Sequence, residues 1–134
     1  MAVDGITEIG PGSVGMLPGG LIRLILPKPP SSNRYWRVYR NRVVKSKEAL
    51  SFIALVDTLA RNLKIRPILT GDVAVDVCWY RGAKRGDLDN LAKCALDALK
   101  NGIVFRDDSQ VAELSMHRRD GTKPERVEVT VWRL

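Results

Sequence analysis

The chain has 134 residues and a basic balance, with 22 Lys and Arg against 15 Asp and Glu and a formal charge of +7. This length fits one domain that buries roughly two-thirds of its unfolded surface, so folding requires neither a disulfide nor a structural metal. No apolar run approaches the ~20 residues of a membrane span, and Asp4 and Glu8 stand where a signal peptide carries Lys or Arg. We expect a cytoplasmic protein, and its charge favours a polyanionic partner without identifying one.

The chain begins with a segment that carries no hydrophobic period. Residues 1–20 include GPGSVGMLPGG, and such a Gly-rich stretch buries too little apolar surface to offset its ordering entropy. We predict a flexible leader over 1–20 and a folded domain over 21–134. The domain opens with LIRLIL, residues 21–26, an apolar run that stops at the prolines of PKPP and is typical of a strand.

Residues 27–47 are predicted to form a loop that contains basic and aromatic residues but no acidic one. Its cations are Lys28, Arg34, Arg37, Arg40, Arg42, Lys45 and Lys47, and its rings are Tyr35, Trp36 and Tyr39. Cations neutralise phosphates and aromatic faces stack on exposed bases, so the mixture favours a nucleic acid with unpaired or distorted regions. The alternative is a solvated turn whose rings close the core, and we expect at least one ring to do so.

The remaining elements follow in order. A helix begins after an N-cap at Ser46, an alternating strand covers 72–80, and a second helix runs from about Asp89 to Lys100. Two further strands are predicted around 111–118 and 126–133, joined by the turn DGTKP. The pattern predicts an α+β (mixed α/β) fold in one small domain, with a mixed sheet of about four strands packed by two main helices.

Asp87 and Asp89 stand two residues apart at the start of the second helix. In an extended segment their carboxylates point to the same side and repel unless a cation lies between them, and Mg²⁺ or Mn²⁺ suits such ligands. The alternative is that Asp89 is only an N-cap and that Lys93 and Asp97 form an exposed ion pair. Spacing alone leaves both open. A third carboxylate would define a site, and Asp107 or Asp108 could supply it if the chain reverses after the helix.

Three segments together resemble the RusA family of Holliday junction resolvases, which prophages often encode. They are PPSSNRYW, RGDLDNLAKCALDALKNGIVFRDDSQV and VEVTVW, and the resemblance covers residues 21–134. It implies Asp87, Asp89 and Asp108 as catalytic metal-binding residues, Lys93 as the catalytic lysine, and a homodimer. Asn90 and Asp107 match further motif positions, to which we assign supporting or structural roles. One departure is that Gly82, Ala83 and Gly86 dilute the Arg run that precedes the first aspartate in some members.

On this reading the chain is a Mg²⁺-dependent endonuclease, with Mn²⁺ able to substitute, that resolves four-way DNA junctions in recombination and repair in a bacterial or phage-infected cell. The residues expected to contact DNA are Arg34, Tyr35, Arg37, Arg40, Arg42, Lys45, Lys84 and Arg85. Asp97 is expected to pair with Lys93. The alternative is a non-catalytic basic module that binds branched DNA. A nucleotide-sugar transferase, supported by the DxD spacing alone, is disfavoured because 134 residues leave little room for such a fold.

Overall fold

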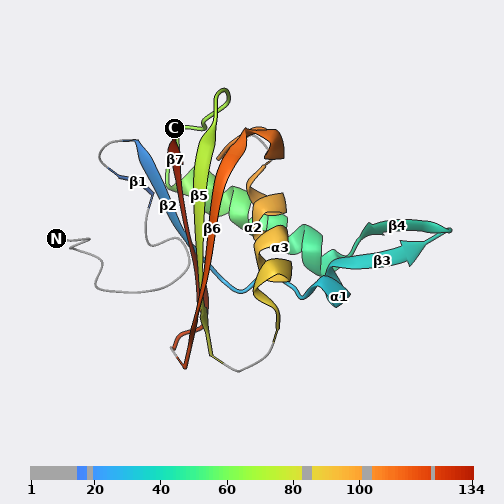
Figure 1. Ribbon diagram of the computed structural model, residues 1–134. Helices are drawn as coiled ribbons and strands as arrows, with labels where there is room; N and C mark the ends of the chain where they lie inside the picture. The colour runs from blue at the N-terminus through green and yellow to red at the C-terminus, as the bar shows by residue number, and fades with distance from the viewer. Residues whose placement is uncertain (1–14, 18–19, 83–85, 101–103, 122) are drawn as a thin grey trace.

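The computed structural model describes residues 15–17, 20–82, 86–100, 104–121 and 123–134. Its main sheet contains five strands in the order β1-β2-β7-β5-β6, and β3 pairs with β4 in a separate hairpin (Figure 1). The strands are β1 (Met16–Leu17), β2 (Leu21–Leu26), β3 (Trp36–Tyr39), β4 (Arg42–Lys45), β5 (Val73–Arg81), β6 (Val111–Asp120) and β7 (Arg126–Arg133). The helices are α1 (Ser32–Tyr35), α2 (Lys47–Asn62), α3 (Leu88–Leu99) and the short 3-10 helix η1 (Asp108–Gln110).

Helices α2 and α3 pack on one face of the main sheet (Figure 1). Alternate residues of β2, β5 and β7 point to this face and join Phe52, Val56 and Leu91 in one buried cluster. The alternation of the three strands therefore sets which side chains form the core. The predicted α+β class, with a mixed sheet and two main helices, is confirmed.

The topology places the two ends of α3 at opposite ends of the strands β5 and β6. Strand β7 is antiparallel to both β2 and β5, whereas β5 and β6 are parallel neighbours. A parallel pair requires a crossover, and α3 supplies it, running back from the carboxyl end of β5 to the amino end of β6. Residues just before α3 and residues just before β6 therefore lie at opposite ends of this unit (Figure 1).

Ser46 caps α2 as predicted, because its hydroxyl accepts a hydrogen bond of 3.1 Å from the backbone N–H of Ala49. The hydroxyl also donates to the Arg34 carbonyl, and the Ser46 N–H donates to the Tyr35 carbonyl at 2.8 Å. One residue thus joins the start of α2 to the end of α1.

Two predictions for the first third of the chain were wrong. β1 lies inside the predicted leader, where Met16 and Leu17 pair with Ile22 and Leu21 of β2. The predicted loop over 27–47 contains α1 and the β3–β4 hairpin. Arg40 and Asn41 turn this hairpin with φ of 50° and 60°, the left-handed geometry of a two-residue type I′ turn. This turn usually carries glycine, and its absence hid the hairpin in the sequence.

Cys78 and Cys94 are both free thiols; Cys94 is buried and Cys78 is half-buried. Burial raises the pKa of the Cys94 thiol. Among the described residues, no helix combines the length and the apolar character that a membrane crossing requires.

Candidate active site

The two motif aspartates lie at the start of α3, just beyond the carboxyl end of β5. Asp87 occupies the N-cap position and Asp89 the first turn, and both are exposed. Within the described residues, the Asp87 carboxylate makes no capping hydrogen bond and accepts a single long one, 3.5 Å, from the side chain of Asn90. Asp89 forms no ion pair with any described residue. Helix capping therefore does not account for either carboxylate, and both have oxygens available for a ligand.

Gly86 allows the chain to enter α3 beside a buried tryptophan. Its φ is +93°, and a Cβ atom there would lie 3.0 Å from Cη2 of Trp79. The Trp79 ring is itself fixed, because its indole N–H donates a hydrogen bond of 3.0 Å to Glu125. The glycine that dilutes the Arg run is thus required by backbone conformation and by close packing against Trp79.

Lys93 follows Asp89 by one helical turn and is exposed. It lines a cavity of about 340 Å³ together with Trp36, Asp97, Asp108 and Leu96, among others. Within the described part of the chain its ammonium group makes no ion pair. Lys93 therefore presents an uncompensated positive charge one turn beyond the aspartate pair, where an anionic substrate could approach.

Asp108 lies at the opposite end of α3 from Asp87 and Asp89. It begins η1, just before β6, and its carboxylate pairs with Lys100 at 3.2 Å. This contact holds the pKa of Lys100 above its usual value. No three acidic, histidine or cysteine side chains of the described residues form a metal cluster. Within the described chain the crossover helix separates Asp108 from Asp87 and Asp89, so the structure does not bring the three aspartates together.

Asp107 caps the short helix η1. Its carboxylate accepts hydrogen bonds from the backbone N–H (3.3 Å) and hydroxyl (2.5 Å) of Ser109, and Gln110 completes a reciprocal capping box with the backbone of Asp107. The hydrogen bond from the Ser109 hydroxyl holds the pKa of Asp107 below its usual value. Gln110 also donates to the carbonyls of Ile68 and Gly71, so this corner is tied to the loop before β5.

Asp97 joins three segments and does not pair with Lys93, contrary to the prediction. Its carboxylate accepts a hydrogen bond from the Tyr35 hydroxyl and forms ion pairs with Lys45 (3.1 Å) and Lys100 (3.4 Å). Partial burial raises its pKa, but the contacts with Tyr35, Lys45 and Lys100 outweigh this and leave the pKa lowered. Since Lys100 also contacts Asp108, a continuous chain of polar contacts connects the hairpin to Asp108.

Tyr35 is not available to stack on DNA, which corrects its assignment as a DNA-binding residue. The side chain is 1% exposed and packs with Ala49 and Cys94, while its hydroxyl bonds to Asp97. Burial, together with that hydrogen bond, raises the pKa of the phenol. The expectation that one ring of the segment closes the core is confirmed, because an aromatic ring next to the Pro-rich turn reaches the space between α2 and α3.

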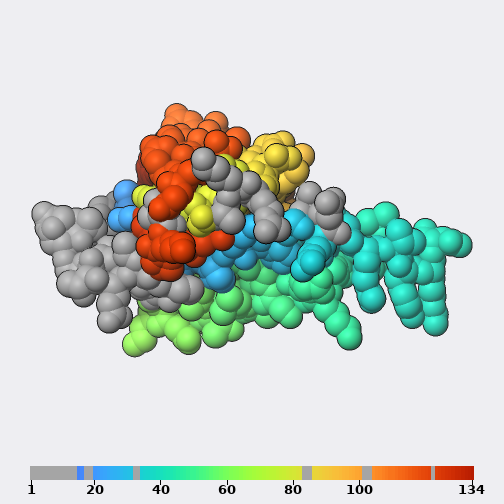
Figure 2. All heavy atoms as spheres, turned by 90° about the horizontal axis from the view of Figure 1, so that it is seen from below, coloured from blue at the N-terminus to red at the C-terminus, as the bar shows by residue number. Residues whose placement is uncertain are grey.

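The β3–β4 hairpin forms an arm that projects from the body of the protein (Figures 1 and 2). The guanidinium groups of Arg37 and Arg40 lie over the ring of Tyr39, at 5.5 and 5.2 Å from its centre, and Tyr39 is 47% exposed. The arm carries the remaining predicted DNA contacts apart from Arg34, which is in α1: Arg37, Arg40, Arg42 and Lys45. Lys84 and Arg85 lie outside the described residues.

The structure adds two residues that reasoning from the sequence did not connect to the site. Lys100 and Asp97 bridge the hairpin and Asp108. The four-residue spacing of Asp89, Lys93 and Asp97 puts all three on one side of the helix, which is the side on which these contacts form. No sequence signal identified its partners, because Tyr35 and Lys45 are more than fifty residues away along the chain.

Comparison with known proteins identifies the family of the chain. The family described as "Endodeoxyribonuclease RusA" matches residues 27–132. Crossover junction endodeoxyribonuclease RusA of Escherichia coli K12 is 35% identical over 109 residues, 81% of this chain and 91% of that protein. The corresponding protein of Enterobacteria phage 82 is 33% identical over the same shares, and that of E. coli O139:H28 is 33% identical over 112 residues, 83% and 93% of the two chains. The chain described here therefore belongs to the RusA family of crossover junction endodeoxyribonucleases.

Proposed function

We propose that this protein resolves Holliday junctions by Mg²⁺-dependent hydrolysis of paired phosphodiester bonds in the bacterial or phage-infected cytoplasm. The observation that carries the proposal is the pair of exposed carboxylates, Asp87 and Asp89, followed one turn later by Lys93. Among the residues that the structure describes, neither carboxylate makes a capping hydrogen bond and Lys93 makes no ion pair. In a chain of the RusA family, this arrangement supports cleavage of a phosphate ester. It is harder to explain in a module that only binds DNA.

The donor set fits a hard divalent cation. Asp87 and Asp89 offer oxygen ligands on an exposed helix start, where an ion can keep several of its waters, as Mg²⁺ and Mn²⁺ prefer. Asn90 donates to one oxygen of Asp87, and no other described residue contacts the second oxygen through a hydrogen bond. When bound, the ion would polarise the scissile phosphate and lower the pKa of a water molecule. Asp108, the third candidate ligand, lies beyond the other end of α3 in the same chain, so we infer that a second copy of the chain supplies it.

A second copy of the chain can supply that residue. β6 is a ten-residue strand at the edge of the main sheet, with Leu114 and Met116 respectively 41% and 38% exposed. A long unpaired edge is a surface for strand pairing. If two copies meet along β6 and the adjacent α3 about a two-fold axis, the elements of the two subunits run antiparallel. The amino end of β6 in one subunit then lies beside the carboxyl end of the partner's β6.

This arrangement brings Asp108 of one subunit to the end of the molecule at which the partner's α3 begins. It also places acidic and basic residues of β6 opposite each other, because Glu113 near one end faces the partner's strand near Arg118 and Arg119. We therefore propose a homodimer with two composite sites, each formed by Asp87 and Asp89 of one subunit and Asp108 of the partner subunit. Two sites related by a two-fold axis suit a four-way junction that is nicked in two strands.

The arm supplies a DNA contact beyond the metal-binding end. Arg37, Arg40 and Arg42 are exposed on it and can neutralise phosphates of a junction arm. Trp36 and Tyr39, 49% and 47% exposed, remain available for contact with unpaired bases at the crossover.

Lys93→Ala is expected to reduce the rate of nicking by about a hundredfold while changing junction affinity only a few-fold. The reason is that its ammonium neutralises charge that builds on the phosphate oxygens in the transition state and is smaller in the ground state. Single-turnover cleavage with enzyme in excess, compared with binding in Ca²⁺, separates the two effects. Equal losses in rate and affinity would show that Lys93 only binds DNA.

The activity is tested with a synthetic four-way junction incubated with and without Mg²⁺ or Mn²⁺. The wild-type protein is expected to nick opposite strands. Asp89→Asn should lower the rate of nicking by at least about two orders of magnitude. It should keep or improve junction binding, because negative charge is removed near phosphate. Asp76→Asn, which removes a carboxylate from the face of the sheet away from the helices, is the matched control. Binding by the wild-type protein without nicking under any divalent ion would favour the non-catalytic binding module.

A further inference from the structure

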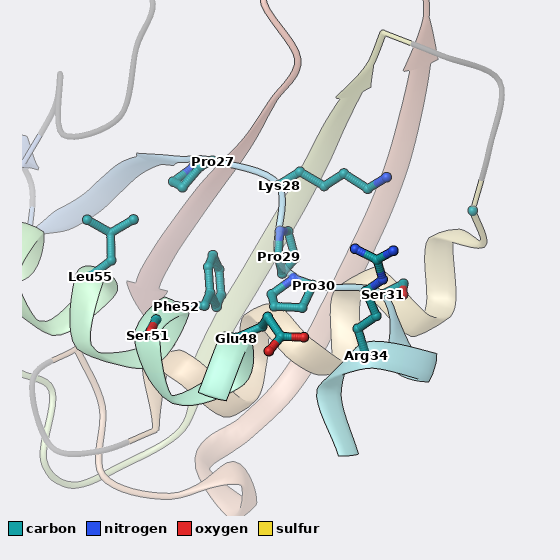
Figure 3. Close-up of a pocket in the computed structure, with 11 residues that line it drawn as sticks. Pro27, Lys28, Pro29, Pro30, Ser31, Arg34, Glu48, Ser51, Phe52 and Leu55 are labelled. Carbon is teal, nitrogen blue, oxygen red and sulfur yellow. The ribbon is translucent and has the colours of Figure 1, made fainter. Parts of the chain in front are cut away.

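A groove follows the segment that connects β2 to α1, between α2 and the start of α3 (Figure 3). It consists of a cavity of about 730 Å³ beside α2 and a second of about 240 Å³ that reaches Asp87 and Asn90. The two cavities share the lining residues Lys28, Pro29, Pro30, Ser31 and Gly86. The groove is therefore continuous with the end of the molecule at which the two unused carboxylates lie.

The lining of the groove combines an apolar floor with cationic side chains. Pro27, Pro29, Phe52 and Leu55 supply the apolar surface, and Lys28 and Arg34 supply the positive charge. Figure 3 shows the Lys28 and Arg34 side chains extending toward the side on which α3 begins. A nucleic-acid strand presents this same combination of apolar sugar and base surfaces with regularly spaced anionic phosphates.

Lys28 is held over a rigid support. Its ammonium lies 5.5 Å from the centre of the Trp79 ring, and Trp79 is buried and bonded to Glu125. The same ring contacts the position of Gly86, at the entrance to α3. The Trp79 ring thus sets the position of the lysine relative to Asp87, which reduces the conformational entropy that the lysine loses when it binds an anion.

Glu48 adds one negative charge to the groove. It is exposed in the first turn of α2 and is the acidic side chain among the residues that line the larger cavity. Figure 3 shows it between Phe52 and Arg34, whereas Lys28 also lines the smaller cavity, which Glu48 does not. A phosphate is attracted to Lys28 and repelled by Glu48. The charges therefore favour phosphate binding at Lys28, in the part of the groove that reaches Asp87.

We propose that the groove binds the cleaved DNA strand next to the scissile phosphate, and that Lys28 contacts a flanking phosphate. The proposal rests on the proposed nuclease function and adds the path of the strand, along Pro27–Ser31 toward α2. This path is separate from the β3–β4 arm, because the described residues that line the groove include none from β3 or β4.

Lys28→Gln is expected to weaken junction binding several-fold and to lower the slope of log affinity against log salt by about one, the effect of one lost phosphate contact. Glu48→Gln should act in the opposite direction and strengthen binding. Lys64→Gln, at the other end of α2, is the matched control for loss of one positive charge and should have little effect. Lys28→Arg should restore most of the affinity, which a loss due only to misfolding would not allow.

Uncharged methylphosphonates, placed one at a time along the cleaved strand, locate the contact. At one position next to the scissile phosphate, the substitution should weaken wild-type binding and have little effect on Lys28→Gln, because each change removes the same contact. Two results would overturn the groove proposal while wild type still nicks the junction. One is equal junction affinity and salt dependence for Lys28→Gln and Lys64→Gln. The other is that the affinity losses of Lys28→Gln and of the methylphosphonate add at every position. Absence of nicking by the wild-type protein would instead overturn the nuclease function on which it rests.

Discussion

Mixing Asp89→Asn subunits with Asp108→Asn subunits is expected to restore nicking that neither variant performs alone. In a mixed dimer, the Asp108→Asn subunit contributes Asp87 and Asp89, and its partner contributes Asp108, so one site is intact and the other has lost two ligands. Random exchange makes half of the dimers mixed, so about a quarter of wild-type sites are recovered. The physical reason is the crossover α3, which keeps Asp108 away from Asp87 and Asp89 in one chain.

A plasmid that extrudes a cruciform distinguishes this recovery from full activity. Paired cleavage by wild type linearises the plasmid, whereas mixed dimers with one working site should produce nicked circles. Mixing Asp87→Asn with Asp89→Asn is the control, because both substitutions affect the same half of each site and no intact site can form. If two differently tagged variants are shown to exchange subunits and nicking does not return, the shared site is wrong.

Asp97→Ala is expected to lower the free energy of unfolding by about 1 to 3 kcal/mol, since it leaves the buried Tyr35 hydroxyl without its acceptor. It should also weaken junction binding, because the root of the arm loses its ion pair with Lys45. Asp97→Asn retains an acceptor for Tyr35 and should cost less stability while still weakening binding. Thermal unfolding, junction affinity and tryptic cleavage within the arm are the measurements, with Asp76→Asn as the control.

The pH dependence of stability provides a second measurement on Asp97. Its pKa is lowered in the folded protein, because its contacts with Tyr35, Lys45 and Lys100 outweigh burial, so its stabilising effect is present above the unfolded pKa of about 3.9 and is lost as the pH falls below it. Asp97→Asn should therefore unfold with a weaker dependence on pH in the acid range than wild type. Arg37→Gln removes a cation of the arm and is combined with Asp97→Asn in a double variant. If the affinity losses of the two single variants add fully in the double variant, Asp97 does not act on DNA binding through the arm.

Much of the fold was predictable because it depends on local periodicity. The alternation in β5 and the apolar spacing in α3 identified a strand and a helix, and Ser46 was correctly placed as the cap of α2. The buried face of α2 does not include every apolar residue of the helix: Leu50 is 55% exposed, and the helix buries Ala49, Phe52, Val56 and Ala60. A helix face is set by what packs against it, which periodicity does not specify.

The arm and its root were not predictable by the same reasoning. Arg40 and Asn41 form a tight turn without a glycine, and two short exposed strands carry little hydrophobic pattern. Tyr35, placed among cations in the sequence, is buried by contacts with α2 and α3 that lie far away along the chain. Such contacts depend on tertiary packing, and they reversed the function assigned to Tyr35.

By itself, the sequence determined the α+β class, the family and the identity of the aspartates and lysine expected to act, because those follow from local pattern and from motif spacing. Tertiary structure alone decided which of these residues meet. Asp87 and Asp89 lie at the start of α3 and Asp108 lies beyond its other end, where Lys100 holds it, while Lys93 lies between them and shares a cavity with Asp108. The reason is topological. A helix that joins two parallel strands must return the chain from the carboxyl end of the first strand to the amino end of the second. Spacing along the sequence does not reveal that separation.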